Sequence, residues 1–140
     1  MKDKDLRIDG IPIAKNRPRV SRRGSHVSVY SDQVKEEKRI KTILKSQLND
    51  FYEGAVIIEC LFVMPRPKSH FGTGRNAGNL KKTAPKVHTK RPDIDNLCKW
   101  VCDCLNGIAY KDDAQVISLS GTKIYGENPF TEINIKQFNA

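Results

Sequence analysis

The strongest constraint on the fold of this chain is an amphipathic helix that is predicted to begin at residues 93–95. Its apolar positions recur at helical spacing and are Ile94, Leu97, Cys98, Val101 and Leu105. Pro92 precedes this stripe and Asn106-Gly107 follows it, as expected for the start and the end of a helix. One face of the helix should therefore be buried, and Trp100 is expected to be a packing residue.

Carboxylates gather at the start of this helix and again just after it. Asp93 is expected at or next to the N-cap, Asp95 in the first turn, and Asp112 and Asp113 in the turn that follows the helix. Magnesium prefers oxygen ligands and usually takes one or two carboxylates while it keeps several waters. These four aspartates are therefore candidate metal ligands. The alternative is that they only cap the helix and form a turn.

A lysine lies within reach of these acids. Lys99 follows Asp95 by four residues and shares its helical face, so it can contact that carboxylate or a phosphate held in front of it. Hydrolysis of a phosphodiester needs an activated water and positive charge around the phosphate, and a bound metal ion supplies both. The pattern predicts a metal-dependent enzyme that acts on nucleic acid.

The charge distribution supports this prediction. The net charge is +9, yet residues 10–31 hold five basic residues and residues 65–92 hold eight, both without an acid. Basic segments that flank an acidic centre are typical of a protein that binds a phosphate backbone. The alternative is that both segments are merely solvated. The candidate DNA contacts are Lys15, Arg17, Arg19, Arg66, Lys68, Lys90 and Arg91.

The remaining pattern predicts an α+β domain in which a small mixed, largely antiparallel sheet packs with two main helices. Strands are expected at residues 6–13, 26–30, 55–64, 115–125 and 131–138, and a helix from Ser31 or Asp32 to about residue 50. We expect the first two strands to form a hairpin and the last two to form an antiparallel pair. Glu59 should lie on an exposed face of the central strand.

The whole chain, residues 1–140, is expected to form a single domain with a long, mobile basic loop at about 65–92. Phe71 in this loop is a candidate to insert between bases. No apolar run is long enough to span a membrane, so a cytoplasmic protein is expected. The cysteines are Cys60, Cys98, Cys102 and Cys104, and their spacing favours buried reduced thiols over a zinc site.

Three blocks in order carry a family resemblance. Residues 91–99 read RPDIDNLCK, residues 103–107 read DCLNG and residues 110–116 read YKDDAQV. This pattern resembles the signature of the RusA-type Holliday junction resolvases, and residues 11–19, IPIAKNRPR, are similar to the opening of that family. The likeness spans most of the chain, and the 65–92 loop is its least familiar part.

The resemblance implies a small α+β homodimer that binds four-way junction DNA and nicks two strands symmetrically. Asp93, Asp95 and Asp113 would hold Mg²⁺, with Mn²⁺ as a substitute, and Asp112 would be a further acidic contributor. Lys99 would contact the scissile phosphate or stabilise developing charge, and Asp103 would orient this lysine. Two alternatives stay open, namely a metal nuclease for other branched DNA and a basic DNA-binding module without catalysis.

Overall fold

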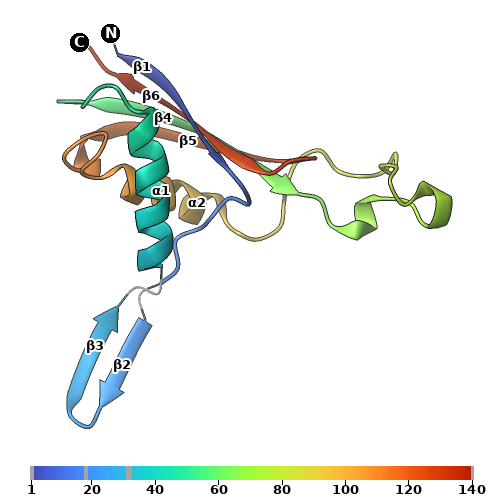
Figure 1. The fold of residues 1–140 in the computed structure, drawn as a ribbon, viewed down its shortest axis with the longest axis horizontal. Helices are drawn as coiled ribbons and strands as arrows, with labels where there is room; N and C mark the ends of the chain where they lie inside the picture. Colours follow the sequence, from blue (N-terminus) through green and yellow to red (C-terminus); the bar gives the residue numbers. More distant parts are fainter. Residues whose placement is uncertain (1, 18, 31–32, 140) are drawn as a thin grey trace.

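The computed structural model describes residues 2–17, 19–30 and 33–139, and it has a sheet with two helices on one of its faces (Figure 1). The sheet has four strands in the order β1-β6-β4-β5. The elements around the core are β1 (Asp3–Asp9), α1 (Val34–Gln47), β4 (Val56–Pro65), α2 (Ile94–Leu105), β5 (Val116–Gly126) and β6 (Phe130–Gln137). This arrangement confirms the predicted α+β class with a mixed, mostly antiparallel sheet.

The order of the strands differs from the expected one. β6 pairs antiparallel with both β1 and β4, whereas β5 pairs with β4 in parallel. The expected direct pairing of β5 with β6 is therefore wrong, because β4 lies between them. β4 carries the most apolar sequence and is buried along most of its length, which suits a central position. Glu59 is exposed on this strand, as predicted.

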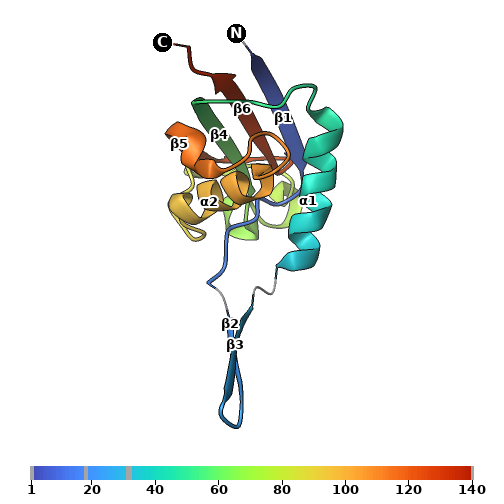
Figure 2. The same cartoon turned by 90° about the vertical axis from the view of Figure 1, so that its left-hand side faces the viewer.

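A separate two-stranded hairpin projects from the body of the protein (Figures 1 and 2). It consists of β2 (Arg19–Arg23) and β3 (His26–Tyr30), with Arg23 opposite His26 and Gly24 in a left-handed conformation at φ 58°. The expected hairpin between residues 6–13 and 26–30 is therefore wrong. The basic segment Arg19–Arg23 is the partner of β3, and β1 pairs with the distant β6 instead.

The first helix begins later and ends earlier than expected. Val34 is its first residue, after an N-cap at Gln33, and the predicted caps Ser31 and Asp32 lie outside the described residues. The helix ends at Gln47, because Leu48 adopts an extended backbone at ψ 134°. Ile40 and Leu44 are its fully buried residues, so only a narrow stripe of α1 reaches the core.

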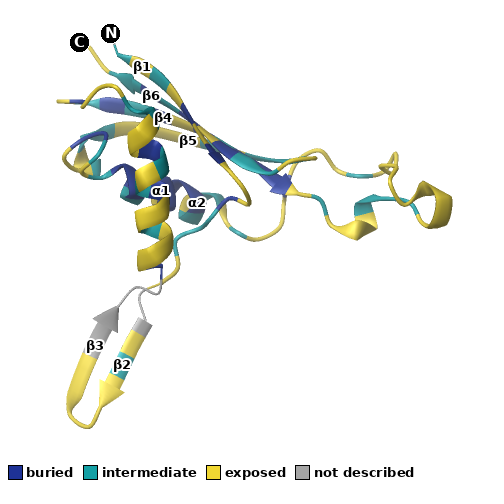
Figure 3. Cartoon of the chain, viewed as in Figure 1, coloured by how far each residue is buried: buried dark blue, intermediate teal, exposed yellow. Residues whose placement is uncertain are grey.

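The core lies between the sheet and the two helices (Figure 3). α2 contributes the larger share, because its apolar face is buried from Leu97 to Leu105, and Trp100 is only 2% exposed. All four cysteines are buried and free, which confirms that prediction. Among the described residues, neither helix is long and apolar enough to cross a membrane.

The predicted basic loop follows β4, and residues 66–92 extend beyond one end of the sheet (Figure 1). We call these residues the basic arm. The basic arm contains two short 3-10 turns, Lys68–His70 and Gly74–Asn76. Isolated bridges join Phe71 to Leu80 and Val87 to Ile124 of β5. The segment is therefore locally structured and attached to the edge of the sheet.

Candidate active site

The start of α2 places the first two acids at the surface. Asp93 occupies the N-cap position with an extended backbone, but its carboxylate forms no capping hydrogen bond. Asp95 lies in the first turn, where one carboxylate oxygen accepts the N–H of Asn96 at 2.9 Å. Both residues are exposed. Because Asp93 does not cap through its side chain, helix capping alone does not account for this acid.

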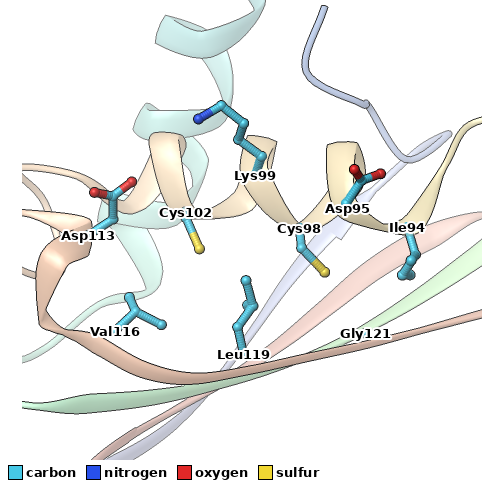
Figure 4. Close-up of a pocket in the computed structure, with 9 residues that line it drawn as sticks. All are labelled: Ile94, Asp95, Cys98, Lys99, Cys102, Asp113, Val116, Leu119 and Gly121. Carbon is cyan, nitrogen blue, oxygen red and sulfur yellow. The ribbon is translucent and has the colours of Figure 1, made fainter.

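A cavity of about 510 Å³ opens between α2 and β5 (Figure 4). Three charged residues line it, and Asp95 and Asp113 lie towards its two ends with Lys99 between them. All three side chains point away from β5, so they form a polar rim. Asp93 and Asp112 do not line the cavity. The structure thus brings together three of the five residues predicted for the site.

The floor of the cavity is apolar. Cys98 and Cys102 point from α2 towards β5, where Leu119 and Gly121 lie (Figure 4). Burial raises the pKa of Cys102 to about 11, so this thiol is neutral at physiological pH. A hydrogen bond between Cys60 and Cys98 raises the pKa of Cys60 and lowers that of Cys98.

Close packing makes glycine necessary at residue 121. A Cβ atom there would lie 2.7 Å from Cys98 Sγ and 3.0 Å from Ile94 Cδ1. A side chain at this position would therefore force the side chains of Cys98 and Ile94 to shift. The absence of a side chain allows the helix to approach the strand closely along one wall of the cavity.

Gln115 holds the turn that carries the second pair of acids. Its side-chain oxygen accepts the backbone N–H groups of Lys111 at 2.9 Å and Asp112 at 3.2 Å. Its side-chain nitrogen donates to the carbonyls of Tyr52 at 3.0 Å and Gly54 at 2.8 Å. This glutamine therefore ties the turn to the segment before β4. Sequence reasoning missed this link, because the two carbonyls that accept from the side-chain nitrogen lie more than sixty residues away.

Asp103 has a different partner from the one that was expected. It was predicted to orient Lys99, but its carboxylate forms an ion pair with Lys15 Nζ at 3.1 Å. Among the described residues, Lys99 forms no salt bridge and is exposed. The lysine on the rim of the cavity therefore remains available to a phosphate, and the prediction that Asp103 orients it is wrong.

The predicted DNA contacts fall into two groups. Lys15 is engaged with Asp103, and Arg66 donates to the Pro85 carbonyl at 2.8 Å while its guanidinium lies over the Tyr125 ring. The exposed members are Arg17, Lys68, Lys90 and Arg91. The side chain of Arg19 lies outside the described part of the chain. The exposed members lie before the hairpin and on the basic arm, and all of them precede the acids in the sequence.

The donor set suits a hard cation. Within residues 2–17, 19–30 and 33–139, no three histidine, cysteine, aspartate or glutamate side chains come close enough to form a ready metal site. Two carboxylates on the rim of one cavity are nevertheless the number that magnesium usually takes from a protein. The neutral thiol of Cys102 on the floor is a poor ligand for such an ion. Asp95 and Asp113 thus offer the oxygen ligands that magnesium prefers, and they lie towards opposite ends of the cavity.

Comparison with known proteins agrees with this chemistry. The family model described as endodeoxyribonuclease RusA matches residues 9–136. A protein of Bacillus subtilis (strain 168), described as uncharacterized protein YqaN, is 34% identical over 137 residues, which covers 95% of each chain. The family match spans the acids at the start of α2, those in the turn before β5, and both basic segments. This chain belongs to the RusA family of endodeoxyribonucleases.

Proposed function

We propose that the protein is a magnesium-dependent endonuclease that resolves four-way DNA junctions by paired, symmetric nicks. The observation that carries this proposal is the cavity between α2 and β5, which Asp95, Lys99 and Asp113 line in a member of an endodeoxyribonuclease family. The exposed lysine and arginine side chains of the hairpin segment and the basic arm supply the positive charge that binds a DNA backbone. A DNA substrate also favours a cytoplasmic location.

We assign different roles, in metal binding and in phosphate binding, to the charged residues that line the cavity. Asp95 and Asp113 would hold the magnesium ion, which when bound supplies an activated water and positive charge at the scissile phosphate. Lys99 carries a positive charge on the same rim and would bind a phosphate oxygen there. Asp93 and Asp112 are close in sequence to Asp95 and Asp113, which line the cavity. They would add negative potential that attracts the cation.

A homodimer would explain how two strands are cut. A four-way junction presents equivalent strands, and a two-fold symmetric enzyme presents two equivalent sites to them. One cavity per chain provides for a single nick. We therefore propose that two copies act together, with Mn²⁺ able to replace Mg²⁺ at each site.

Cleavage of a labelled synthetic junction tests this proposal. Linear duplex and single-stranded DNA serve as comparison substrates, each with Mg²⁺, Mn²⁺ or EDTA. The variants Asp95→Asn and Asp113→Asn should lose paired nicking by at least about a hundredfold while they still bind the junction in EDTA. Glu59→Gln is the matched control, because this exposed acid lies on β4 and does not line the cavity.

Two other results would contradict the proposed junction resolvase activity, each in a different way. Junction binding without any metal-dependent nick would favour a DNA-binding module. Equal cutting of all three substrates would favour a general nuclease. Sedimentation of the junction complex distinguishes one bound copy from two, and a single copy that makes both nicks would overturn the dimer.

A further inference from the structure

A second cavity, of about 490 Å³, lies where the basic arm meets the end of the sheet. Phe71 and Leu80 of the arm line it together with Arg66, and Glu127 lines it from the turn after β5. None of these residues contributes to the cavity between α2 and β5. We call this second cavity the arm pocket.

Hydrogen bonds across the arm shape the walls of the pocket. Phe71 and Leu80 form a bridge, and the Gly72 N–H donates to the Asn79 carbonyl at 3.0 Å. The Lys81 N–H donates to the His70 carbonyl at 2.9 Å. A Cβ atom on Gly72 would lie 2.6 Å from Asn76 Cβ, so the loop closes tightly beside Phe71. The aromatic wall is therefore held by the backbone of the arm.

The cationic rim is also held in place. Arg66 contacts His70 Nδ1 at 3.2 Å and the Pro85 carbonyl at 2.8 Å, and its guanidinium lies 5.3 Å from the centre of the Tyr125 ring. The His70 and Tyr125 rings meet edge to face, with 4.6 Å between their centres. These contacts link the pocket to β5, which carries Tyr125.

The lining chemistry suits a flat heteroaromatic group. Aromatic and aliphatic side chains favour the face of such a group, while Glu127 supplies a hydrogen-bond acceptor at the edge. The surrounding arm holds eight basic residues and no acid, so the group should be attached to a polyanion. A nucleobase on a DNA strand combines these properties.

We propose that the arm pocket receives one unpaired nucleobase, which stacks on Phe71 and donates a hydrogen bond from its exocyclic amino group to Glu127. This inference deepens the proposed function, on which the identity of the DNA substrate rests. Adenine, cytosine and guanine carry such an amino group, whereas thymine offers only its ring N3–H, so we expect the pocket to favour the bases that carry the amino group.

The arm pocket and the active site would contact different nucleotides of the bound DNA strand. Gly121 lines the first cavity and Gly126 lines the arm pocket, and both lie on β5. Five strand residues at a rise of about 3.3 Å separate these glycines by about 17 Å. The captured base therefore lies several nucleotides from the cleaved phosphate. A paired base at that separation would have to leave its stack before it enters the pocket.

Binding of single strands isolates the pocket from catalysis. Kd is measured by fluorescence anisotropy in EDTA for labelled oligo-dC and oligo-dT of equal length, with wild type, Phe71→Leu, Phe71→Ala and Glu127→Gln. Wild type should prefer oligo-dC. Loss of stacking should weaken oligo-dC binding by about 5- to 100-fold in the two Phe71 variants. Phe138→Ala is the matched control, because Phe138 is exposed and lies at the end of β6, outside the pocket.

The glutamate is tested through a ratio. Glu127→Gln removes a negative charge near both oligonucleotides, so this effect cancels when the two Kd values are compared. A glutamine amide both donates and accepts, and the ratio of the oligo-dT to the oligo-dC Kd should therefore fall towards one. Phe71→Leu keeps an apolar side chain on the arm, so a folded variant with lost stacking is available even if Phe71→Ala unfolds.

The outcomes separate this inference from the proposed function. Wild-type affinity for oligo-dC in folded Phe71→Leu, or an equal preference for both oligonucleotides in wild type, would overturn the arm pocket whether or not junctions are cut. An intact dC preference that depends on Phe71, in a protein that never cuts a junction with Mg²⁺, would overturn the nuclease and support the pocket.

Discussion

Lys15 Nζ lies 3.1 Å from Asp103 Oδ2, and this ion pair joins the segment before the hairpin to the third turn of α2. The two side chains are only 20% and 17% exposed. The backbone N–H of Lys15 also donates to the Asn96 carbonyl at 2.9 Å. One residue of the N-terminal segment thus contacts α2 near both of its ends, so the position of the acids depends on a distant part of the chain.

Removal of this lysine should destabilise the fold. Lys15→Met leaves the carboxylate of Asp103 without its partner in a mostly buried position, and we expect the free energy of unfolding to fall by about 1–3 kcal/mol. Lys15→Met with Asp103→Asn should recover part of this loss, because the unpaired charge is gone. Urea denaturation of both variants measures the difference. An unchanged free energy of unfolding, together with weaker DNA binding, would instead give Lys15 a role in DNA contact.

Substitution of Gly121 should widen the gap between α2 and β5. The new methyl group of Gly121→Ala meets Cys98 Sγ, so we expect a loss of about 1–3 kcal/mol of stability. Cys98→Ala removes the obstructing sulfur, and the double variant should be more stable than Gly121→Ala alone. Additive losses in thermal and urea unfolding would show that the two positions do not contact each other.

The four cysteine thiols should react slowly with a thiol reagent in the folded protein. All four are buried, and burial raises the pKa of Cys102 to about 11 and that of Cys104 to about 12. A maleimide should therefore label the native protein slowly at neutral pH and label all four cysteines in denaturant. Mass spectrometry counts the labelled sites. Fast single labelling of the native protein at Cys98 would reveal that the active-site cavity admits the reagent.

Stability should decline under mildly acidic conditions because of His88. Burial, and then the nearby Lys123, hold the pKa of His88 below its usual value. The unfolded chain therefore binds this proton more readily, so the stabilisation is complete above about pH 6.5 and is lost as the pH falls through the folded pKa. His88→Gln should flatten the decline of unfolding free energy between about pH 8 and about pH 5.5.

A residual slope is expected in that variant. Burial and the charges of Arg66 and Lys81 also lower the pKa of His70, and this group still titrates. His70→Gln in the His88→Gln background provides the control. A pH profile of His88→Gln that coincides with that of wild type would contradict the assignment.

Salt dependence should identify the lysines that contact phosphate. Lys68 is exposed on the basic arm, and Lys68→Gln should reduce the slope of log affinity against log salt by about 0.9 if it neutralises one phosphate of duplex DNA. Lys45→Gln, in the last turn of α1, is the matched control. An unchanged slope for Lys68→Gln would remove this residue from the interface. Anisotropy titrations in EDTA at several salt concentrations provide the measurement.

Local patterns predicted the elements near the site. The apolar spacing from Ile94 to Leu105 predicted α2, and its start at the acids follows from the same pattern. The apolar run of β4 was equally visible. These signals depend on neighbours within a few residues, so they can be read directly from the sequence.

Long-range relationships were not visible in this way. Nothing near Arg19 indicates that it pairs with Tyr30 rather than lying in a turn, and nothing in β5 shows that β4 separates it from β6. The partner of Asp103 was assigned to the nearest lysine along the helix, whereas the fold brings Lys15 to it. Pairings of this kind depend on tertiary packing, which the spacing of residues along the sequence does not reveal.

The hairpin joins the body of the protein at a point where one side chain holds two chain segments together. Gln33 accepts the N–H of Asn16 at 2.9 Å and donates to the Ala14 carbonyl at 2.8 Å, so one side chain bridges the point where the chain leaves the body and the point where it returns. The base of this excursion is therefore fastened to the body by one side chain. We expect hairpins of other lengths and sequences to be accepted between Asn16 and Gln33 while the body keeps its packing, and we expect DNA preference to be easiest to alter there.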